Sequence, residues 1–325
     1  MIQFKQVSKY FGDVTAVRDL SLHVEEGELL VLLGTSGCGK TTTLKMVNRL
    51  IEPSSGRILV EGEDVMNVDP IRLRREIGYA IQHIGLFPHM TVADNISVVP
   101  TLKNWSGAEI SRRVDELLDM VGLDPSHFRE RYPAQLSGGQ KQRIGVARAI
   151  AADPDIVLMD EPFGALDPIT REQLQEEFLT LQDQLQKTIV FVTHDVFEAV
   201  KLADRVALLD AGQLQQLAPP AEIVENPANE FVDRFLGEHR FQLMLLTRSI
   251  RPLMGEGSEP GVIPEEAKMP PTATMVEALD VFKKTDVDEL PVYEDEEFCG
   301  VLRREDVIDA IAEAMSRKAG GERGE

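Results

Sequence analysis

The chain has 325 residues, 43% of them hydrophobic, and a formal net charge of −21 at pH 7. This length suits about two domains, and the hydrophobic content supplies a buried core and excludes a disordered chain. The acidic balance argues against broad nucleic-acid binding, which leaves a basic footprint. The sequence has neither an apolar run of membrane-spanning length nor a signal-peptide pattern at its start, so we expect a chain that stays in the cytoplasm.

The charge is distributed unevenly along the chain. Residues 251–325 carry 19 acidic and 9 basic side chains, a net charge of −10, which is nearly half of the total. This indicates that a different module begins near residue 240. The only cysteines, Cys38 and Cys299, have no paired spacing and are interpreted as reduced thiols.

In chain order, the first elements are strands. Apolar residues alternate with polar neighbours over residues 2–7 and again over residues 20–24, which predicts a small antiparallel β layer at the N-terminus. Continuous apolar runs at 29–33, 156–159 and 189–192 are typical of strands buried on both faces of a parallel sheet. Helical patterns separate these runs, and residues 87–152 form a mostly helical insertion. We therefore expect an α/β core, followed by a helix from Asn229 to about Leu246.

A glycine-rich loop directly follows the first buried run and precedes helical sequence, in the pattern G-x-x-x-x-G-K-[ST]. Its glycines allow successive backbone N–H groups to face one anion. Lys40 would reach the β- and γ-phosphates of a nucleotide, and the Thr41 hydroxyl would ligate Mg²⁺. An incidental glycine-rich turn is the alternative. The predicted nucleotide-binding residues here are Gly34, Thr35, Ser36, Gly37, Cys38, Gly39, Lys40, Thr41 and Thr42.

The buried run at 156–159 ends in two carboxylates, Asp160 and Glu161. A carboxylate just past a parallel strand lies at the edge where nucleotides bind. Asp160 is then placed to hold Mg²⁺, and Glu161 to polarise the attacking water. The alternative is an acidic turn at a strand end, which is common; the position of the pair about 120 residues after the phosphate loop favours the functional interpretation.

A second phosphate-facing helix start is predicted at Leu136-Ser137-Gly138-Gly139-Gln140, where two glycines follow a serine. Together with the phosphate loop and the acidic pair, this string resembles the ABC ATPase family. The resemblance covers about residues 1–240. It implies a P-loop NTPase core.

The resemblance carries further site residues by their order along the chain. Phe11 matches the aromatic residue that stacks on adenine, with a core role in the β layer as the alternative. Gln82 matches the glutamine that touches metal and water. Asp167, in Ala165-Leu166-Asp167, belongs to the loop that crosses the dimer interface. His194 matches the histidine that contacts the γ-phosphate.

The family mechanism implies that ATP and Mg²⁺ lie between residues 34–42 of one subunit and residues 137–140 of the other. The active species is then a homodimer. Glu161, His194 and Gln82 would be catalytic, and Thr41, Gln82 and Asp160 would bind the metal. Because the motif set is complete, both composite sites of a homodimer should be competent.

Segments 44–50, 78–89 and 161–168 are similar to those of importers for quaternary amines such as glycine betaine, carnitine and choline. The implied partners are permease subunits and, through them, a substrate-binding protein, with the chain peripheral at the cytoplasmic face of the membrane. Ile84, Leu86 and Phe87 would line the groove for the permease, with core packing as the alternative. The remaining alternatives are an importer for another solute and a non-transport ABC ATPase.

The acidic module resembles a single CBS domain at 246–313, followed by a tail at 314–325. Segments 275–279, 289–293, 300–302 and 306–311 predict a helix, two strands and a closing helix. CBS repeats work in pairs, so either two protomers pair their single repeats or the module is degenerate and binds no regulator. Its charge suggests a response to ionic strength, and a dimerisation domain without ligand is the alternative.

Overall fold

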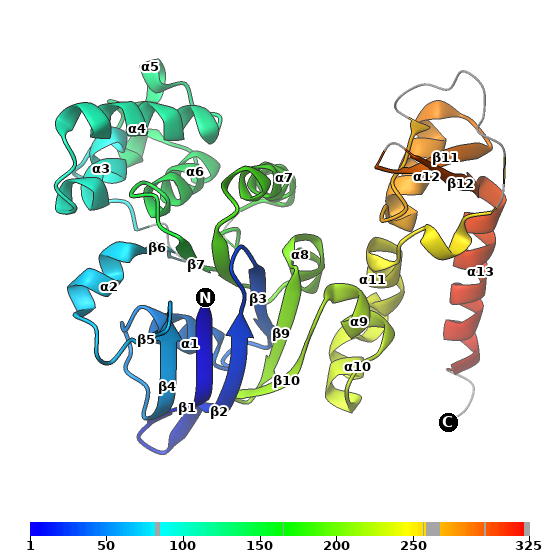
Figure 1. Cartoon of the computed structure of the whole chain (residues 1–325), viewed down its shortest axis with the longest axis horizontal. Coiled ribbons are helices and arrows are strands. Elements are labelled where there is room, and N and C mark those ends of the chain that lie inside the picture. The colour runs from blue at the N-terminus through cyan, green and yellow to red at the C-terminus, as the bar shows by residue number, and fades with distance from the viewer. Residues whose placement is uncertain (82–84, 165, 256, 258–266, 296, 322–325) are drawn as a thin grey trace. The chain divides into compact units, whose positions relative to one another are not determined.

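A computed structural model of the chain describes residues 1–81, 85–164, 166–255, 257, 267–295 and 297–321 (Figure 1). The chain divides into two compact units, Met1–Pro219 and Pro220–Glu325. Within the described residues, no helix has both the length and the apolar character required to cross a membrane.

Unit 1 begins with a four-stranded antiparallel sheet in the order β2-β1-β4-β5. Ile2 and Phe4 of β1 point into the core, whereas Gln3 and Lys5 between and beside them are less buried. This alternation is the pattern of a half-buried strand and confirms the predicted N-terminal β layer. The strands are β1 (Ile2–Phe11), β2 (Val14–Val24), β4 (Ser55–Val60) and β5 (Glu63–Asp64).

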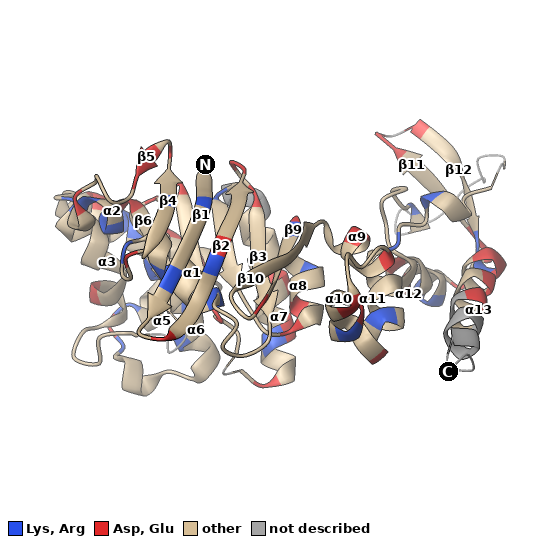
Figure 2. Ribbon diagram, turned by 90° about the horizontal axis from the view of Figure 1, so that it is seen from below, with Lys and Arg blue, Asp and Glu red and all other residues tan. Residues whose placement is uncertain are grey.

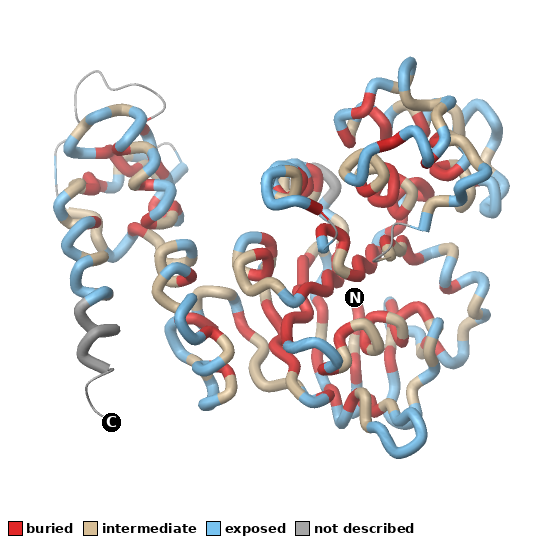
Figure 3. Tube along the Cα trace, turned by 180° about the vertical axis from the view of Figure 1, so that it is seen from behind, coloured by how far each residue is buried: buried red, intermediate tan, exposed pale blue. Residues whose placement is uncertain are grey.

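The second sheet of unit 1 has six strands in the order β10-β9-β3-β8-β7-β6. Five of them are parallel, and only β10 runs antiparallel to its neighbour β9. Every residue of β3, β7 and β8 is buried, as Figure 3 shows for the centre of this unit. The predicted parallel sheet is therefore confirmed. The strands are β3 (Leu29–Gly34), β6 (Ile77–Ala80), β7 (Ile156–Asp160), β8 (Thr188–Val192), β9 (Arg205–Asp210) and β10 (Gln213–Ala218).

Helix α1 (Lys40–Val47) lies between the two sheets and contacts strands of both. Its Leu44, Met46 and Val47 are buried in one apolar cluster with residues of both sheets. On the other face of the six-stranded sheet, Phe163, Phe178 and Phe191 pack together in edge-on and tilted arrangements at centroid separations of 5.8–6.2 Å. This packing fixes α7 (Pro168–Leu185) over the sheet, beside α8 (Val196–Leu202). Helix α2 (Pro70–Glu76) leads into β6.

The predicted helical insertion forms a group of helices at one side of the six-stranded sheet in Figure 1, with α6 in contact with β6. Thr91, Ser106 and Ser137 each close a capping box at a helix start, which satisfies two orphan backbone N–H groups per helix. The elements are α3 (Val92–Leu102), α4 (Gly107–Met120), α5 (Pro125–Phe128), η1 (Pro133–Gln135) and α6 (Gly138–Ala149).

Unit 2 opens with helices and closes with a small α+β module. The helix predicted from Asn229 to about Leu246 is interrupted at Gly237, whose positive φ of 45° ends α10. Residues Gly255 and Met269 pair with the outer edges of β12 and β11, respectively. The elements are α9 (Pro220–Glu225), α10 (Glu230–Leu236), η2 (Gly237–His239), α11 (Arg240–Thr247), η3 (Arg251–Leu253), α12 (Met275–Thr285), β11 (Glu289–Glu294), β12 (Glu297–Arg303) and α13 (Arg304–Gly321).

The order α12, β11, β12, α13 is the helix, strand, strand and helix predicted for the C-terminal module. Its own apolar cluster includes Phe282, Leu290, Leu302 and Val307. Acidic side chains occupy the first turns of α13 and the tips of β11 and β12, as Figure 2 shows. The concentration of negative charge is therefore on the surface of a module with its own core.

Candidate functional site

The phosphate loop lies between β3 and α1, and glycine is required at two of its positions. Gly34 and Gly39 have φ values of 149° and 105°. A Cβ at Gly39 would lie 2.3 Å from the Ala16 carbonyl oxygen, and one at Gly34 would lie 2.2 Å from that of Leu209. Neighbouring backbone therefore leaves no space for any side chain, which explains why the loop is glycine-rich.

Lys40, the first residue of α1, is buried and hydrogen-bonds to carbonyl groups of the phosphate loop. Its Nζ donates to the Gly34 oxygen at 2.8 Å and to the Thr35 oxygen at 2.9 Å. The N-cap residue Gly39 offers no side-chain acceptor, so no side chain caps the N–H groups at the start of α1. A buried ammonium group beside uncapped N–H groups is an electrostatic environment that favours an anion.

Cys38 of the loop is buried, with its Sγ 3.8 Å from Lys40 Nζ. Burial raises the pKa of the Cys38 thiol despite the opposing influence of Lys40. The thiol therefore stays neutral and packs as a small apolar group.

Thr41 and Asp160 meet at the end of β7. The Thr41 hydroxyl donates to Asp160 Oδ1 at 2.8 Å. Burial raises the pKa of Asp160, against the lowering effects of the Thr41 hydrogen bond and of Lys45. Thus a partly desolvated carboxylate and a hydroxyl oxygen lie together, which are ligands that Mg²⁺ prefers.

Glu161 and His194 follow neighbouring parallel strands and face each other. Glu161 Oε1 lies 3.4 Å from His194 Nδ1, and the Glu161 N–H donates to the Val192 carbonyl oxygen at 3.0 Å. The side chain of Glu161 is 19% exposed and that of His194 is 61% exposed. Glu161 also has a positive φ of 47°, an uncommon conformation for a non-glycine residue that clusters at functional sites.

The remaining predicted residues that the structure describes lie in the phosphate loop and in other elements of unit 1. Ser137 caps α6 and accepts from the Gln140 N–H at 3.2 Å, and the neighbouring Gly138 and Gly139 complete an exposed helix start. Phe11 is 49% exposed, with Lys9 Nζ 4.9 Å from its ring centroid. Ser36, Gly37 and Thr42 belong to the phosphate loop and α1. Gln82, Ile84 and Ala165 lie outside the described residues.

Asp167 is the N-cap of α7, and its carboxylate accepts from the Thr170 N–H at 3.1 Å. Hydrogen bonds from the side chain and backbone of Thr170 lower the pKa of Asp167. Ile169, two residues on, is 73% exposed. It is a single exposed apolar side chain beside the predicted interface loop.

The loop before α3 is held from within by Asn95, which is completely buried. Asn95 Oδ1 accepts from the Phe87 N–H at 2.8 Å, and its Nδ2 donates to the carbonyl oxygens of Phe87, Met90 and Thr91 at 3.2, 3.2 and 2.8 Å. Arg148 donates to the Gly85 carbonyl oxygen at 2.7 Å. The result is a fixed loop that presents Phe87 at 41% exposure.

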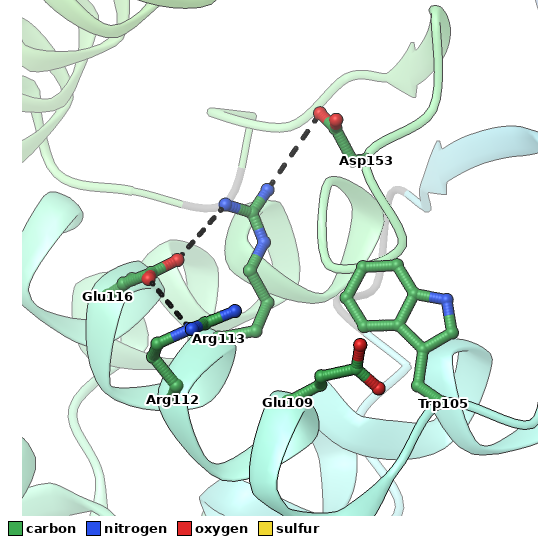
Figure 4. Close-up of a pocket in the computed structure, with 6 residues that line it drawn as sticks. All are labelled: Trp105, Glu109, Arg112, Arg113, Glu116 and Asp153. Carbon is green, nitrogen blue, oxygen red and sulfur yellow. Dashed lines mark ion pairs between the residues drawn. The ribbon is translucent and has the colours of Figure 1, made fainter.

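A separate pocket of about 310 Å³ shares no residue with the predicted site (Figure 4). Its lining residues pair with one another: Arg113 lies 3.6 Å from Glu116 and 4.0 Å from Asp153, while Arg112 lies 3.6 Å from Glu116. Arg113 also donates to the carbonyl oxygens of Ile150 and Ala151 after α6. These contacts give Arg113 a structural role at the end of α6. The lining residues are Trp105, Glu109, Arg112, Arg113, Glu116 and Asp153.

Motif order did not predict four polar residues behind His194, namely Arg171, Gln175, Thr193 and Glu198. Three of them are polar residues at helix positions that are buried or half-buried, and Thr193 is a buried residue directly before His194. No sequence period distinguishes such residues from a solvent-exposed face.

Comparisons with known proteins agree with this geometry. Residues 17–164 match the family described as "ABC transporter", and residues 263–313 match "CBS domain". The chain is 58% identical over 241 residues to the glycine betaine/carnitine/choline transport ATP-binding protein OpuCA of Bacillus subtilis. The match covers 74% of this chain and 63% of OpuCA, so the chain spans less than two thirds of that relative. It is 48% identical over 312 residues to the glycine betaine uptake system ATP-binding protein YehX of Escherichia coli, covering 95% of this chain and 99% of YehX.

Among solved structures, a dimeric post-hydrolysis state of the ATP-binding cassette MJ0796, bound to ADP and Pi, superposes with a TM-score of 0.61 at 32% identity. The match covers 67% of this chain and 98% of that one.

Proposed function

This chain belongs to the ABC transporter family, and from that premise we propose that it binds and hydrolyses ATP to power import of a quaternary amine such as glycine betaine, choline or carnitine. The observation that carries the proposal is the grouping of Lys40, Thr41, Asp160, Glu161 and His194 at one edge of the parallel sheet. An anion-favouring helix start, two oxygen ligands and a paired carboxylate and imidazole are the parts that phosphoryl transfer to water requires.

The residues present fit a magnesium nucleotide. Among the described residues, no group of three or more His, Cys, Asp or Glu side chains could hold a metal alone. Mg²⁺ is usually held by one or two protein oxygens plus substrate phosphates, so Thr41 and Asp160, with Gln82, suffice as its proposed ligands. When bound, Mg²⁺ neutralises charge on the phosphates.

We assign the chemical roles as follows. Lys40 and the N–H groups at the start of α1 bind the phosphates and stabilise developing negative charge. Glu161, held 3.4 Å from His194, accepts a proton from the attacking water, while His194 orients toward the γ-phosphate. Gln82 positions that water. Phe11, exposed at the tip of the β layer, stacks on the adenine.

We further propose that the working unit is a homodimer. Ser137, Gly138, Gly139 and Gln140 form an exposed to half-buried helix start whose polar groups are suited to the phosphates of a nucleotide held by the partner subunit. The exposed Ile169 beside Asp167 supports a subunit contact there. A dimer with two composite sites follows from two-fold symmetry.

The proposed membrane partner is a permease, with a substrate-binding protein acting through it, and the chain would be peripheral at the cytoplasmic face. Phe87, exposed on a loop fixed by Asn95, supports a docking surface for an apolar helix of the permease. We propose residues 1–240 as the ATPase domain and the CBS-like module as regulatory.

The test of the ATPase assignment is Glu161→Gln in the full chain. We expect it to retain ATP binding, measured at equilibrium with a fluorescent ATP analogue, while phosphate release falls by at least ~10²-fold because the proton acceptor is lost. Wild-type turnover in this variant would refute the assignment. For the cargo, ATPase stimulation in proteoliposomes with the permease and binding protein should depend on glycine betaine, choline or carnitine, and stimulation only by an unrelated solute would refute it.

A further inference from the structure

Helices α7 and α8 begin at two different loops of the proposed site. Helix α7 starts at its N-cap Asp167, directly after Leu166, and α8 starts at its N-cap Asp195, directly after His194. The two starts are joined by side chains rather than by backbone pairing. Two such connections link α7 to α8 next to His194.

The first connection is buried. Gln175 of α7 donates through Nε2 to Glu198 Oε1 of α8 at 3.0 Å, and both residues are at most 7% exposed. The Thr193 side chain also hydrogen-bonds the Glu198 carboxylate, and burial raises the pKa of that carboxyl. Burial of a carboxylate is unfavourable unless it is well hydrogen-bonded, so this link favours one arrangement of α7, α8 and the residue before His194.

The second connection runs through Arg171. Its Nη2 donates to the Leu166 carbonyl oxygen at 3.0 Å, and its Nη1 lies 3.8 Å from Asp195 Oδ2. Arg171 Nε is buried without a partner among the described residues. An unpaired buried donor is unfavourable, so the guanidinium group joins the two loops through its two Nη atoms alone.

Asp195 connects Arg171 to the turn that contains His194, because Asp195 also forms hydrogen bonds within that turn. Its carboxylate accepts from the N–H groups of Phe197 and Glu198 at 2.9 and 3.3 Å. Its own N–H donates to Thr193 Oγ1 at 3.0 Å. His194 is therefore flanked on both sides by residues of one hydrogen-bonded network, while its own side chain is largely exposed.

We propose that Arg171 is a positioning residue for ATP hydrolysis, which together with the Gln175–Glu198 hydrogen bond ties the 166–167 loop to the His194 turn and sets the imidazole against Glu161. This inference rests on the proposed ATPase function. It adds that a displacement of the 166–167 loop, which faces the partner subunit in the proposed dimer, changes the orientation of His194. Arg171 acts through Asp195 and touches no reacting atom.

The chain offers a matched control on the same two helices. Glu176 of α7 and Lys201 of α8 form an exposed ion pair at 3.6 Å, so this pair also connects α7 to α8. It contacts neither Leu166 nor Asp195. Glu176→Gln therefore removes an α7–α8 contact without touching the network, and it should leave ATP hydrolysis unchanged.

The first readout does not need activity. The chain has six histidines, so the imidazole signals in a two-dimensional NMR spectrum are few, and the His194→Ala variant identifies that of His194. Arg171→Ala should move the chemical shifts of the His194 imidazole signal, whereas Glu176→Gln should not. An unmoved His194 signal in folded Arg171→Ala would overturn the proposal, whether or not the chain hydrolyses ATP.

The second readout is a double-mutant cycle on steady-state hydrolysis by the full chain. Arg171→Ala should lower kcat about tenfold with KM within about twofold, and Arg171→Lys should recover part of the loss. In the His194→Ala background, Arg171→Ala should change kcat by less than about twofold, because its effect passes through His194. The same tenfold loss in that background would refute the mechanism. If Arg171→Ala fails to fold, Gln175→Leu takes its place in the cycle with the same expectation.

The two proposals fail differently. A wild-type chain that binds but does not hydrolyse ATP contradicts the proposed function and leaves the NMR test intact. A wild-type chain that hydrolyses ATP, with additive Arg171 and His194 effects, contradicts only the positioning role.

Discussion

Replacing Asn95 with alanine removes the side chain that fastens the loop from Phe87 to Thr91. The two protons of Nδ2 and the acceptor Oδ1 together support three full hydrogen bonds, shared among the four contacts of 2.8–3.2 Å. Each such bond contributes about 1 kcal/mol net, so we expect the free energy of unfolding to fall by about 3 kcal/mol.

The measurement is urea unfolding followed by tryptophan fluorescence. Trp105 is the only tryptophan and lies in unit 1, so its signal follows the unit that contains Asn95. Thr101→Ala is the control, because Thr101 is exposed on the same helix and its loss should change stability by less than about 0.5 kcal/mol. A decrease below about 1 kcal/mol for Asn95→Ala would show that water replaces the lost bonds and would refute the reasoning. Nucleotide hydrolysis by the isolated chain should be unaffected, while stimulation by the permease should fall.

Two further predictions concern the nucleotide site. Because burial raises the pKa of Asp160, its ionised form destabilises the nucleotide-free fold, and this contribution worsens as pH rises from the ordinary Asp value of about 3.9 through the raised one. Asp160→Asn should therefore raise the urea midpoint above that of the wild-type chain at pH 7 but not at pH 3, and it should weaken Mg²⁺-dependent ATP binding. Equal midpoints for the variant and the wild-type chain at pH 7 would contradict this. Gly39→Ala should weaken ATP binding and lower the free energy of unfolding by more than ~2 kcal/mol, because its Cβ meets the Ala16 oxygen at 2.3 Å. Gly37→Ala has no atom within 4 Å of its Cβ and should lower the free energy of unfolding by only about 1 kcal/mol. A higher melting temperature for Gly39→Ala than for Gly37→Ala would contradict this.

The parallel sheet could be predicted because fully buried parallel strands need continuous apolar sequence. β3, β7 and β8 are buried over their whole length, and each is a continuous apolar run apart from one terminal residue (Gly34, Asp160 and Thr188, respectively). The interruption of the helix at Gly237 was not predicted, since an isolated glycine is compatible with a helix interior at a modest penalty. Only the backbone conformation, with φ of 45°, shows that the chain turns there.

The network behind His194 could not be predicted from sequence for a different reason. Gln175 and Glu198 are 23 positions apart, and both are residue types that normally lie on a solvent-exposed helix face. Their burial depends on how α7 packs beside α8 over the sheet. That packing is a tertiary property, which one helix period does not contain.

The convergence of the site residues, in contrast, follows from strand register. Val192 of β8 pairs with Leu32 of β3 on one side and with Asp160 of β7 on the other. Parallel neighbours in register end at the same edge of the sheet, so the residues that follow them meet there, although the first of them precedes the other two by more than 100 positions in sequence. Gly34, Glu161 and His194 are each within two residues of that line. Register thus explains why motifs placed after three apolar runs predict a shared site. Ser137 follows no strand of the sheet and lies in the helical group, so in the proposed dimer it serves the site of the second subunit.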